Sequence, residues 1–251
     1  MEEKVFFKNA NGSKLCGVLS DPTGDKTKTI VIICHGYNSS KDRPSYTSFS
    51  SKLYELGIAS FRFDFFGNGE SEGKIEDLTI SEAVEDIHLS IQYLKTLEYT
   101  NVGLFGSSFG GTAALIAASK TNELSFLSLR CPIPNYEDRA KQKLGAETIV
   151  QWKRTGFLYN EEDKVNMKYS FYEDFKNNDG YEAAKKVLIP TCIVVGDADE
   201  FVPIEQIYKI QPLLQKLELT VISGADHQFT NKEHNKHMFE TLMKFIMKHV
   251  V

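Results

Sequence analysis

The residues best suited to chemistry form a Gly-x-Ser-x-Gly pattern, Gly106-Ser107-Ser108-Phe109-Gly110. An apolar run ends at Gly106 and small helix-forming residues follow Gly110, so the pattern predicts a strand, a sharp turn and a helix, with Ser108 at the turn. The residues two positions before and after such a serine crowd each other and must be small. The helix that follows directs its first N–H groups at the serine, which suits a developing oxyanion. The pattern therefore predicts that Ser108 is a nucleophile.

A serine hydroxyl needs a base to accept its proton and an acid to orient that base. His227 is the best candidate for the base, because it lies in a glycine-containing loop after the last predicted strand. His35 ends a central strand, and we expect it to hold the neighbouring loop by hydrogen bonds. The remaining histidines are interpreted as solvated residues of helices: His88, His234, His237 and His249.

Two aspartates compete for the role of the orienting acid. Asp197 and Asp199 both follow the strand that precedes the histidine loop, and the chemistry of the residues does not decide between them. With either aspartate, the order along the chain is serine, acid, histidine. That order is typical of α/β-hydrolases and differs from the orders in chymotrypsin-like and subtilisin-like enzymes.

Composition and charge exclude several classes of protein. The chain has 251 residues, of which 41% are hydrophobic and 25% are charged, and its net charge is −5. These values are typical of a globular domain, and they give no electrostatic reason to expect nucleic acid or an anionic membrane as a partner. The amino-terminal residues carry early acidic side chains without an apolar segment, and no apolar run is long enough to span a membrane. We therefore expect a cytoplasmic protein.

The cysteines are far apart and lie in apolar, strand-like contexts, which favours buried thiols over a disulfide framework. They are Cys16, Cys34, Cys131 and Cys192. No cluster of cysteine, histidine or acidic residues has the spacing of metal ligands, so we predict neither a metal site nor any other cofactor.

Strands and helices alternate along most of the chain. Strands are predicted at 4–9, 14–20, 30–34, 58–63, before Gly106, and at 124–129, 191–195 and 219–222. Helices are predicted at 45–55, 79–97, from Ser108 to about 119, and at 203–216 and 231–248. Because the central strands are continuously apolar, we predict an α/β fold with a mostly parallel sheet and helices on both faces. Ligands bind such sheets at the carboxyl ends of the strands.

Residues 131–186 interrupt this alternation with a charged and aromatic segment. We interpret residues 1–130 and 187–251 as the core domain and 131–186 as a small lid inserted into it. Six aromatic residues of this segment are candidates for the wall of an apolar pocket, with Trp152 preferred: Trp152, Phe157, Tyr159, Tyr169, Phe171 and Tyr172. The alternative for each is packing of the lid onto the core.

Four motifs give the chain a resemblance to the esterase and serine aminopeptidase-like branch of the α/β-hydrolases, and in particular to bacterial feruloyl (cinnamoyl) esterases. They are HGY at 35–37, DFFGNGES at 64–71, GDADEFVP at 196–203 and GADHQF at 224–229. The sequence departs from the family pattern at Asn68, where histidine is common. It departs again at Ser107, which precedes the nucleophile and is often histidine.

The resemblance assigns roles to particular residues. It implies that Asp199, rather than Asp197, is the acid that orients His227. It also implies an oxyanion hole built from the backbone N–H groups of Tyr37 and Phe109. Asp64 and the glycines that follow it are interpreted as a tight turn beside the site.

The leading hypothesis is a serine hydrolase that cleaves small carboxylic esters through an acyl-enzyme intermediate, without a cofactor. The first alternative is a peptidase or amidase of the serine aminopeptidase type, because the same site can cleave amides. A non-catalytic binding module on a hydrolase fold is less favoured, because all three members of the triad are present. The sequence leaves both a monomer and a homodimer open.

Overall fold

The computed structural model describes residues 2–161 and 164–251. Its strands are β1 (Glu2–Lys8), β2 (Lys14–Ser20), β3 (Ile30–Cys34), β4 (Ala59–Phe63), β5 (Val102–Ser107), β6 (Leu124–Arg130), β7 (Phe157–Asn160), β8 (Val165–Lys168), β9 (Thr191–Gly196) and β10 (Leu217–Ile222). Its α-helices are α1 (Pro44–Glu55), α2 (Ile80–Thr96), α3 (Phe109–Ala118), α4 (Tyr136–Thr155), α5 (Tyr169–Phe175), α6 (Gly180–Ala184), α7 (Ile204–Ile210) and α8 (Lys232–His249). Short 3₁₀ turns lie at Ile75–Asp77 and Gln211–Leu213.

An eight-stranded sheet in the order β1-β2-β4-β3-β5-β6-β9-β10 organises the molecule. The strands from β4 to β10 are parallel, whereas β1 and β2 form an antiparallel hairpin at one edge. Every residue of β3, β4 and β5 is buried, as the continuously apolar sequence of β3 in particular predicts. The predicted mostly parallel sheet is confirmed.

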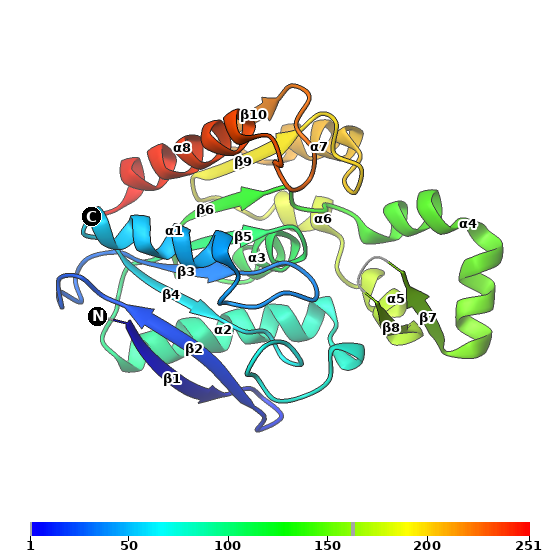
Figure 1. Cartoon of the computed structure of the whole chain (residues 1–251), viewed down its shortest axis with the longest axis horizontal. Helices are drawn as coiled ribbons and strands as arrows, with labels where there is room; N and C mark the ends of the chain where they lie inside the picture. The colour runs from blue at the N-terminus through cyan, green and yellow to red at the C-terminus, as the bar shows by residue number, and fades with distance from the viewer. Residues whose placement is uncertain (1, 162–163) are drawn as a thin grey trace.

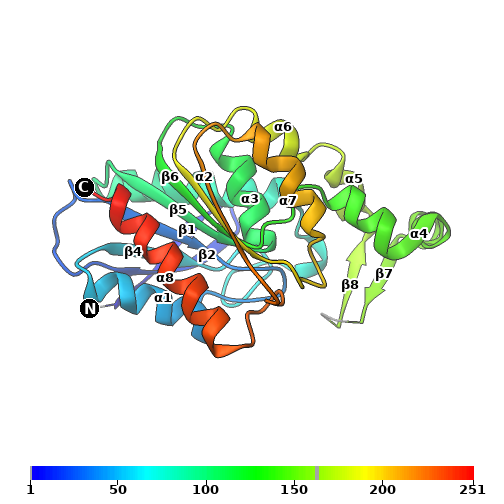
Figure 2. The same ribbon diagram turned by 90° about the horizontal axis from the view of Figure 1, so that it is seen from above.

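Helices cover both faces of the sheet, as Figures 1 and 2 show. On one face, Phe49 of α1 stacks on Phe105 of β5 at 4.3 Å between ring centroids and also contacts Phe239 of α8. On the other face, α2 packs against α3, followed by α6 and α7. This layering fixes the carboxyl ends of the parallel strands at one edge, where the loops that follow them meet.

One predicted helix is wrong in its extent. The helix expected at 203–216 is α-helical only over α7 and then tightens into the 3₁₀ turn Gln211–Leu213. Pro212 is the physical reason, because proline has no N–H to donate and its ring clashes with the preceding turn of an α-helix. The last strand, β10, accordingly begins at Leu217 rather than at 219.

Residues 131–186, which we call the insert, carry α4, the hairpin β7–β8, α5 and α6. Most of the insert projects beyond the sheet, on the right in Figure 1, and α6 returns to contact α3 and α7. Helix α4 is interrupted at Gly145, whose φ of 74° and ψ of 164° are not helical. The division into a core domain and a lid stays a prediction.

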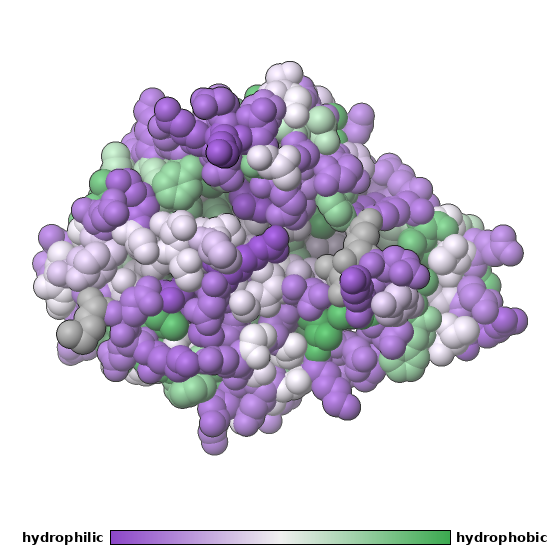
Figure 3. Space-filling view, viewed as in Figure 1, coloured by the Kyte–Doolittle hydropathy of each residue, from purple (hydrophilic) through white to green (hydrophobic). Residues whose placement is uncertain are grey.

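Hydrophilic side chains dominate the face of the molecule seen in Figure 3, and apolar ones form small patches, several of them over the insert. Among the helices of the described residues, none combines the length and the apolar character that a membrane span requires.

Candidate active site

Ser108 stands at a sharp turn between β5 and α3, with φ of 53° and ψ of −119°. Neighbouring backbone leaves no room for side chains on either side of this turn. A Cβ atom on Gly106 would lie 2.4 Å from the carbonyl oxygen of Gly110, and one on Gly110 would lie 2.3 Å from that of His35. The spacing of glycines around the serine therefore follows from close packing of the turn.

The structure brings together the three side chains that the sequence nominates. His227 Nε2 lies 3.0 Å from Ser108 Oγ, and His227 Nδ1 lies 2.7 Å from Asp199 Oδ2. The side chains of Asp199 and His227 are 1% and 5% exposed, so this chain of hydrogen bonds is shielded from water. With Nδ1 donating to the carboxylate, Nε2 can accept the serine proton.

Asp199 is fixed as a carboxylate by its surroundings. Its Oδ1 accepts hydrogen bonds from the backbone N–H groups of Phe201 and Val202, both at 2.8 Å. Burial opposes ionisation, but the hydrogen bond from His227 and the two N–H groups outweigh it and lower the pKa of the Asp199 carboxyl. Asp197, in contrast, is exposed and accepts from the N–H of Gly224 at 2.6 Å.

The loop after β3 approaches the other side of Ser108. His35 Nε2 accepts from the N–H of Phe65 at 3.1 Å, so its Nδ1 donates to the carbonyl of Gly36 at 2.7 Å. This is the supporting role that the sequence predicted for His35, and burial lowers its pKa, which favours the neutral ring. The rings of Tyr37 and Phe109 then meet edge to face, with centroids 5.6 Å apart.

Asp64 also holds the loop between β3 and α1 in place. Its Oδ1 accepts from the backbone N–H of Lys41 at 2.7 Å, while its Oδ2 accepts from Lys41 Nζ at 2.8 Å and from the N–H of Glu70 at 2.9 Å. Asp64 and Lys41 are both almost fully buried. The motif at 64–71 is thus a turn that holds the loop before α1 in place.

Asp86 of α2 holds the next residue of this turn, since its Oδ2 accepts from the N–H of Phe66 at 2.9 Å. Burial, with smaller contributions from Glu82 and Glu85, raises the pKa of the Asp86 carboxyl to about 8. An unfolded aspartate ionises near pH 4, so the folded state loses stability as the pH rises from about 4 through 8.

We therefore expect the difference in melting temperature between Asp86→Asn and the wild-type protein to shift in favour of the variant as the pH is raised from 5 to 8.5. The gain should reach several degrees, because each unit of pKa difference corresponds to about 1.4 kcal/mol and 1 kcal/mol shifts Tm by about 2–4 °C in a protein of this size. Thermal melts of both proteins at several pH values measure it. Glu240→Gln, which changes an exposed residue of α8 on the other face of the sheet, should show no such trend, and parallel curves for Asp86→Asn and the wild-type protein would contradict the raised pKa of Asp86.

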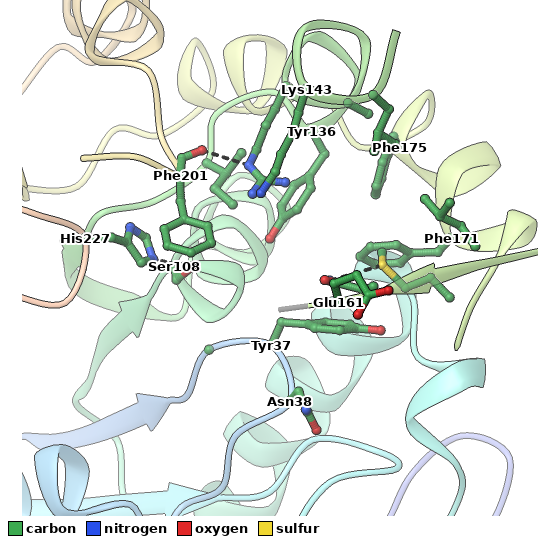
Figure 4. A pocket seen from close by; sticks show the side chains of 18 of the residues that line it. Tyr37, Asn38, Ser108, Tyr136, Lys143, Glu161, Phe171, Phe175, Phe201 and His227 are labelled. Atoms are coloured by element: carbon green, nitrogen blue, oxygen red, sulfur yellow. Dashed lines mark hydrogen bonds between the residues drawn. The ribbon is translucent and has the colours of Figure 1, made fainter. Parts of the chain in front are cut away.

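A cavity of about 660 Å³ opens above Ser108 and His227, between the core and the insert. Aromatic side chains from both parts surround it in Figure 4, with Tyr37 and Phe201 on the core side and Tyr136, Phe171 and Phe175 on the insert side. The ring of Phe201 lies against the His227 ring, with centroids 4.9 Å apart. A small, largely apolar molecule placed in this cavity would reach the serine hydroxyl.

Comparison with known families decides the classification. The profile of the family described as serine aminopeptidase, S33, matches residues 25–160, just over half of the chain. The chain belongs to this S33 family of α/β-hydrolases. The resemblance stated from the motifs is thereby confirmed at the level of the family.

Individual relatives of this S33-family chain are diverse. The quorum-quenching protein AidA of Acinetobacter baumannii is 29% identical over 161 residues, which are 62% of this chain and only 51% of that protein. The palmitoyl-protein thioesterase ABHD10 of Mus musculus is 24% identical over 242 residues, 92% of this chain and 79% of that protein. The structure of Est1E from Butyrivibrio proteoclasticus with bound ferulic acid superposes with a TM-score of 0.84 at 24% identity and covers 98% of both chains. These similarities confirm the predicted α/β-hydrolase fold.

The aromatic residues proposed for the pocket divide into two groups. Trp152, Tyr159 and Phe171 line the cavity, whereas Phe157, Tyr169 and Tyr172 are absent from its wall. Trp152 also packs within the insert, because its Nε1 donates to the carbonyl of Met167 at 2.9 Å and its side chain is only 1% exposed. Trp152 therefore does both things that the sequence analysis treated as alternatives: it lines the cavity and it packs within the insert.

Sequence reasoning missed several residues of the cavity wall in this S33-family chain. Tyr136 and Phe175 lie in the insert, where no periodic pattern marks the inward face of the helices. Phe201 follows the acid within the motif at 196–203, and its position beside Asp199 was an available signal. Arg130 was also detectable, as a charged residue at the carboxyl end of a buried strand.

The remaining histidines in the described ranges lie away from the cavity wall. The interpretation of His88 as solvated was wrong, because it is half-buried and its Nε2 lies 3.2 Å from the carbonyl of Ala117. It links α2 to α3.

One group of potential metal ligands occurs in the part of the chain that the structure describes, formed by Cys131, Asp199 and His227. His227 and Asp199 already bond to each other through Nδ1 and Oδ2. Burial, together with the nearby Asp199 carboxylate, raises the pKa of the Cys131 thiol well above its usual value, so this sulfur stays protonated. A protonated thiol is a poor metal ligand, and the group fits the hydrogen-bonded triad better than a metal centre.

Proposed function

We propose that this S33-family chain is a serine hydrolase of small carboxylic esters and thioesters that acts through an acyl-enzyme. The observation that carries the proposal is the continuous hydrogen-bonded chain from Ser108 through His227 to Asp199, open to a cavity lined by aromatic side chains. Ferulic acid is bound in the structurally similar Est1E, and ABHD10 is named as a thioesterase. Both relatives support a carboxylic ester or thioester with an apolar acyl group as the substrate.

In the first half of the reaction, His227 Nε2 accepts the proton of Ser108 as Oγ attacks the acyl carbon. The oxyanion that forms is proposed to accept hydrogen bonds from the N–H groups of Tyr37 and Phe109. Protonated His227 then gives its proton to the leaving alcohol or thiol as the bond to the acyl carbon breaks. Asp199 stabilises the imidazolium without taking its proton.

In the second half, water replaces the alcohol. His227 accepts a proton from water, the resulting hydroxide attacks the acyl carbon, and the same N–H groups bind the second oxyanion. Collapse of that intermediate releases the carboxylic acid and returns the proton to Ser108. We propose that the insert acts as the lid over this chemistry, because it supplies the aromatic half of the cavity wall.

The family description favours an aminopeptidase as the second candidate. An aminopeptidase must recognise a positively charged amino group, for which a carboxylate is the natural partner. Among the described residues of the cavity wall, Glu161 is the one carboxylate, against five cationic side chains: Arg43, Arg130, Arg139, Lys143 and Lys164. This balance favours the esterase over the aminopeptidase.

A panel of substrates tests the proposal. We expect 4-nitrophenyl esters of short and medium acyl chains, methyl ferulate and an acyl thioester to be turned over at least about tenfold faster, by kcat/KM, than an aminoacyl 4-nitroanilide. Amides resist hydrolysis more strongly than activated esters, so the ratio should be compared with that of uncatalysed hydrolysis. A relative preference for the anilide would establish the peptidase instead. The cytoplasmic location and the homodimer considered above stay predictions.

A further inference from the structure

Arg130 is an unusual residue beside the nucleophile. It ends β6, pairs directly with Ser107 of β5, and its carbonyl accepts the N–H of Ser108 at 2.8 Å. The residue is only 8% exposed, yet it belongs to the wall of the cavity that contains Ser108. Among residues 2–161 and 164–251, the Nε atom of Arg130 has no acceptor although it is fully buried, whereas its two terminal nitrogens are not enclosed in this way.

Such burial is unfavourable for the folded protein. A guanidinium group removed from water normally gains a carboxylate or several carbonyl acceptors in return. Arg130 gains the ring of Phe229, whose centroid is 5.9 Å from the guanidinium carbon, and a contact of this kind offsets only part of the lost hydration. A charged group kept in this state, at the wall of a candidate active site, is expected to have a partner in the substrate.

Ser107 shares this environment. It lies next to Arg130 across the β5–β6 pair, is 1% exposed, and belongs to the same cavity wall. Its hydroxyl also has no hydrogen-bond partner among the described residues. The Ser107 hydroxyl is enclosed like Arg130 Nε, so an incoming acceptor would meet the terminal nitrogens of the guanidinium group, and this planar group matches the two oxygens of a carboxylate best.

The rest of the cavity supplies the complementary half of a binding site. The insert contributes aromatic side chains, among them Tyr136, Phe171 and Phe175 (Figure 4). Arg130 comes from the core, at the end of β6 and opposite the residue before the serine. Arg139 adds a second guanidinium, which donates from Nε to the carbonyl of Phe201 at 2.8 Å. An apolar arm and an anionic arm of one substrate can thus lie on different sides of Ser108.

We propose that Arg130 is a specificity-determining residue that binds a carboxylate of the substrate. The preferred substrates are then esters with a carboxylate on one side of the scissile bond and an apolar group on the other. This inference rests on the proposed ester hydrolysis and narrows its substrate class.

Two matched pairs of esters test the proposal, one for each side of the scissile bond. The acyl side is probed by mono-(4-nitrophenyl) adipate against 4-nitrophenyl hexanoate, and the alcohol side by 3-acetoxybenzoate against its methyl ester. In at least one pair, the anionic ester should have a kcat/KM at least about tenfold above that of the neutral one. Wild-type ratios at or below one in both pairs would overturn the proposal.

In the pair for which the wild-type protein prefers the anionic ester, Arg130→Met should lower the anionic-to-neutral ratio of kcat/KM at least about tenfold. Arg130→Lys keeps the charge but loses the planar guanidinium group, and it should give an intermediate ratio. Arg154→Met is the matched control, because Arg154 is exposed on α4 and outside the cavity wall. It should leave the ratio unchanged. An unaltered ratio in both Arg130 variants would contradict a role in specificity.

Thermal melting separates this role from a structural one. Since Arg130 is buried without an acceptor, Arg130→Met should melt at the same temperature as the wild-type protein or higher. A lower melting temperature in both Arg130 variants, with the ratio unchanged, would show that the arginine serves the fold instead.

Binding to the Ser108→Ala variant distinguishes failure of this inference from failure of the proposed function. If the wild-type protein hydrolyses neither the anionic nor the neutral esters of the two pairs, the proposed ester hydrolysis is wrong. Calorimetry with Ser108→Ala still compares the anionic and neutral esters, and the anionic member of one pair should bind at least about tenfold more tightly. Equal affinities within both pairs would refute the carboxylate site even when hydrolysis is observed.

Discussion

Ser108→Ala should lower kcat/KM for 4-nitrophenyl butyrate by at least about a thousandfold. The hydroxyl is the group 3.0 Å from His227 Nε2, and no acyl-enzyme can form without it. Activity above that of water can remain, because the oxyanion donors and the cavity are unchanged. Initial rates measured at several substrate concentrations give the ratio.

The control for this variant is Ser119→Ala, which changes a serine at the far end of the same helix and should leave kcat/KM within about twofold. Circular dichroism and thermal melting should show that both variants are folded. If folded Ser108→Ala retained more than about a tenth of the wild-type activity, Ser108 would not be the nucleophile.

The second large effect is expected at the acid. Asp199→Asn should lower kcat by about 10³ to 10⁴ with a smaller change in KM. An asparagine can present its NH₂ group to His227 Nδ1, which places the ring proton on Nε2, where it can no longer accept the proton of Ser108. The folded state lowers the pKa of Asp199, so its carboxylate also contributes to stability, and we expect a modest fall in Tm as well.

Asp197→Asn provides a matched comparison two residues earlier. Asp197 is exposed and contacts the N–H of Gly224, a bond that the asparagine side chain can keep, so its kcat should stay within about threefold of the wild-type value. Steady-state kinetics of the two variants side by side measure the difference. Equal losses in both, or a larger loss in Asp197→Asn, would reject Asp199 as the orienting acid.

Much of the fold could be predicted from the sequence because its signals are local. The continuously apolar segments that became β3 and β5 can be satisfied only inside a sheet covered on both faces. The turn at Ser108 requires glycines at fixed positions, whatever surrounds it. The end of α7 was missed although its signal, Pro212, is equally local.

The insert could not be predicted in the same way. Its helices are short or interrupted, and α4 contains the non-helical Gly145. Some of its aromatic residues line the cavity, while others contact one another, as Tyr169 and Tyr172 do with Trp152. An abundance of aromatic residues in the sequence therefore does not reveal which of them contact a substrate. The same ambiguity explains why Tyr136 and Phe175 were not recognised.

By itself, the sequence determined the fold class and nominated Ser108 and His227, because backbone geometry and strand order leave a trace in residue types and spacing. The choice between Asp197 and Asp199 needed either a family resemblance or distances in space, and the 2.7 Å bond to His227 is a contact between residues 28 positions apart. For Arg130 the sequence marks only a charged residue at the end of a buried strand, and its surroundings are decided by the tertiary structure. Only the packing of β5, β6 and the loop of Phe229 shows that this arginine is buried beside the nucleophile without an acceptor, since burial and pairing are properties of neighbours that the chain order does not record.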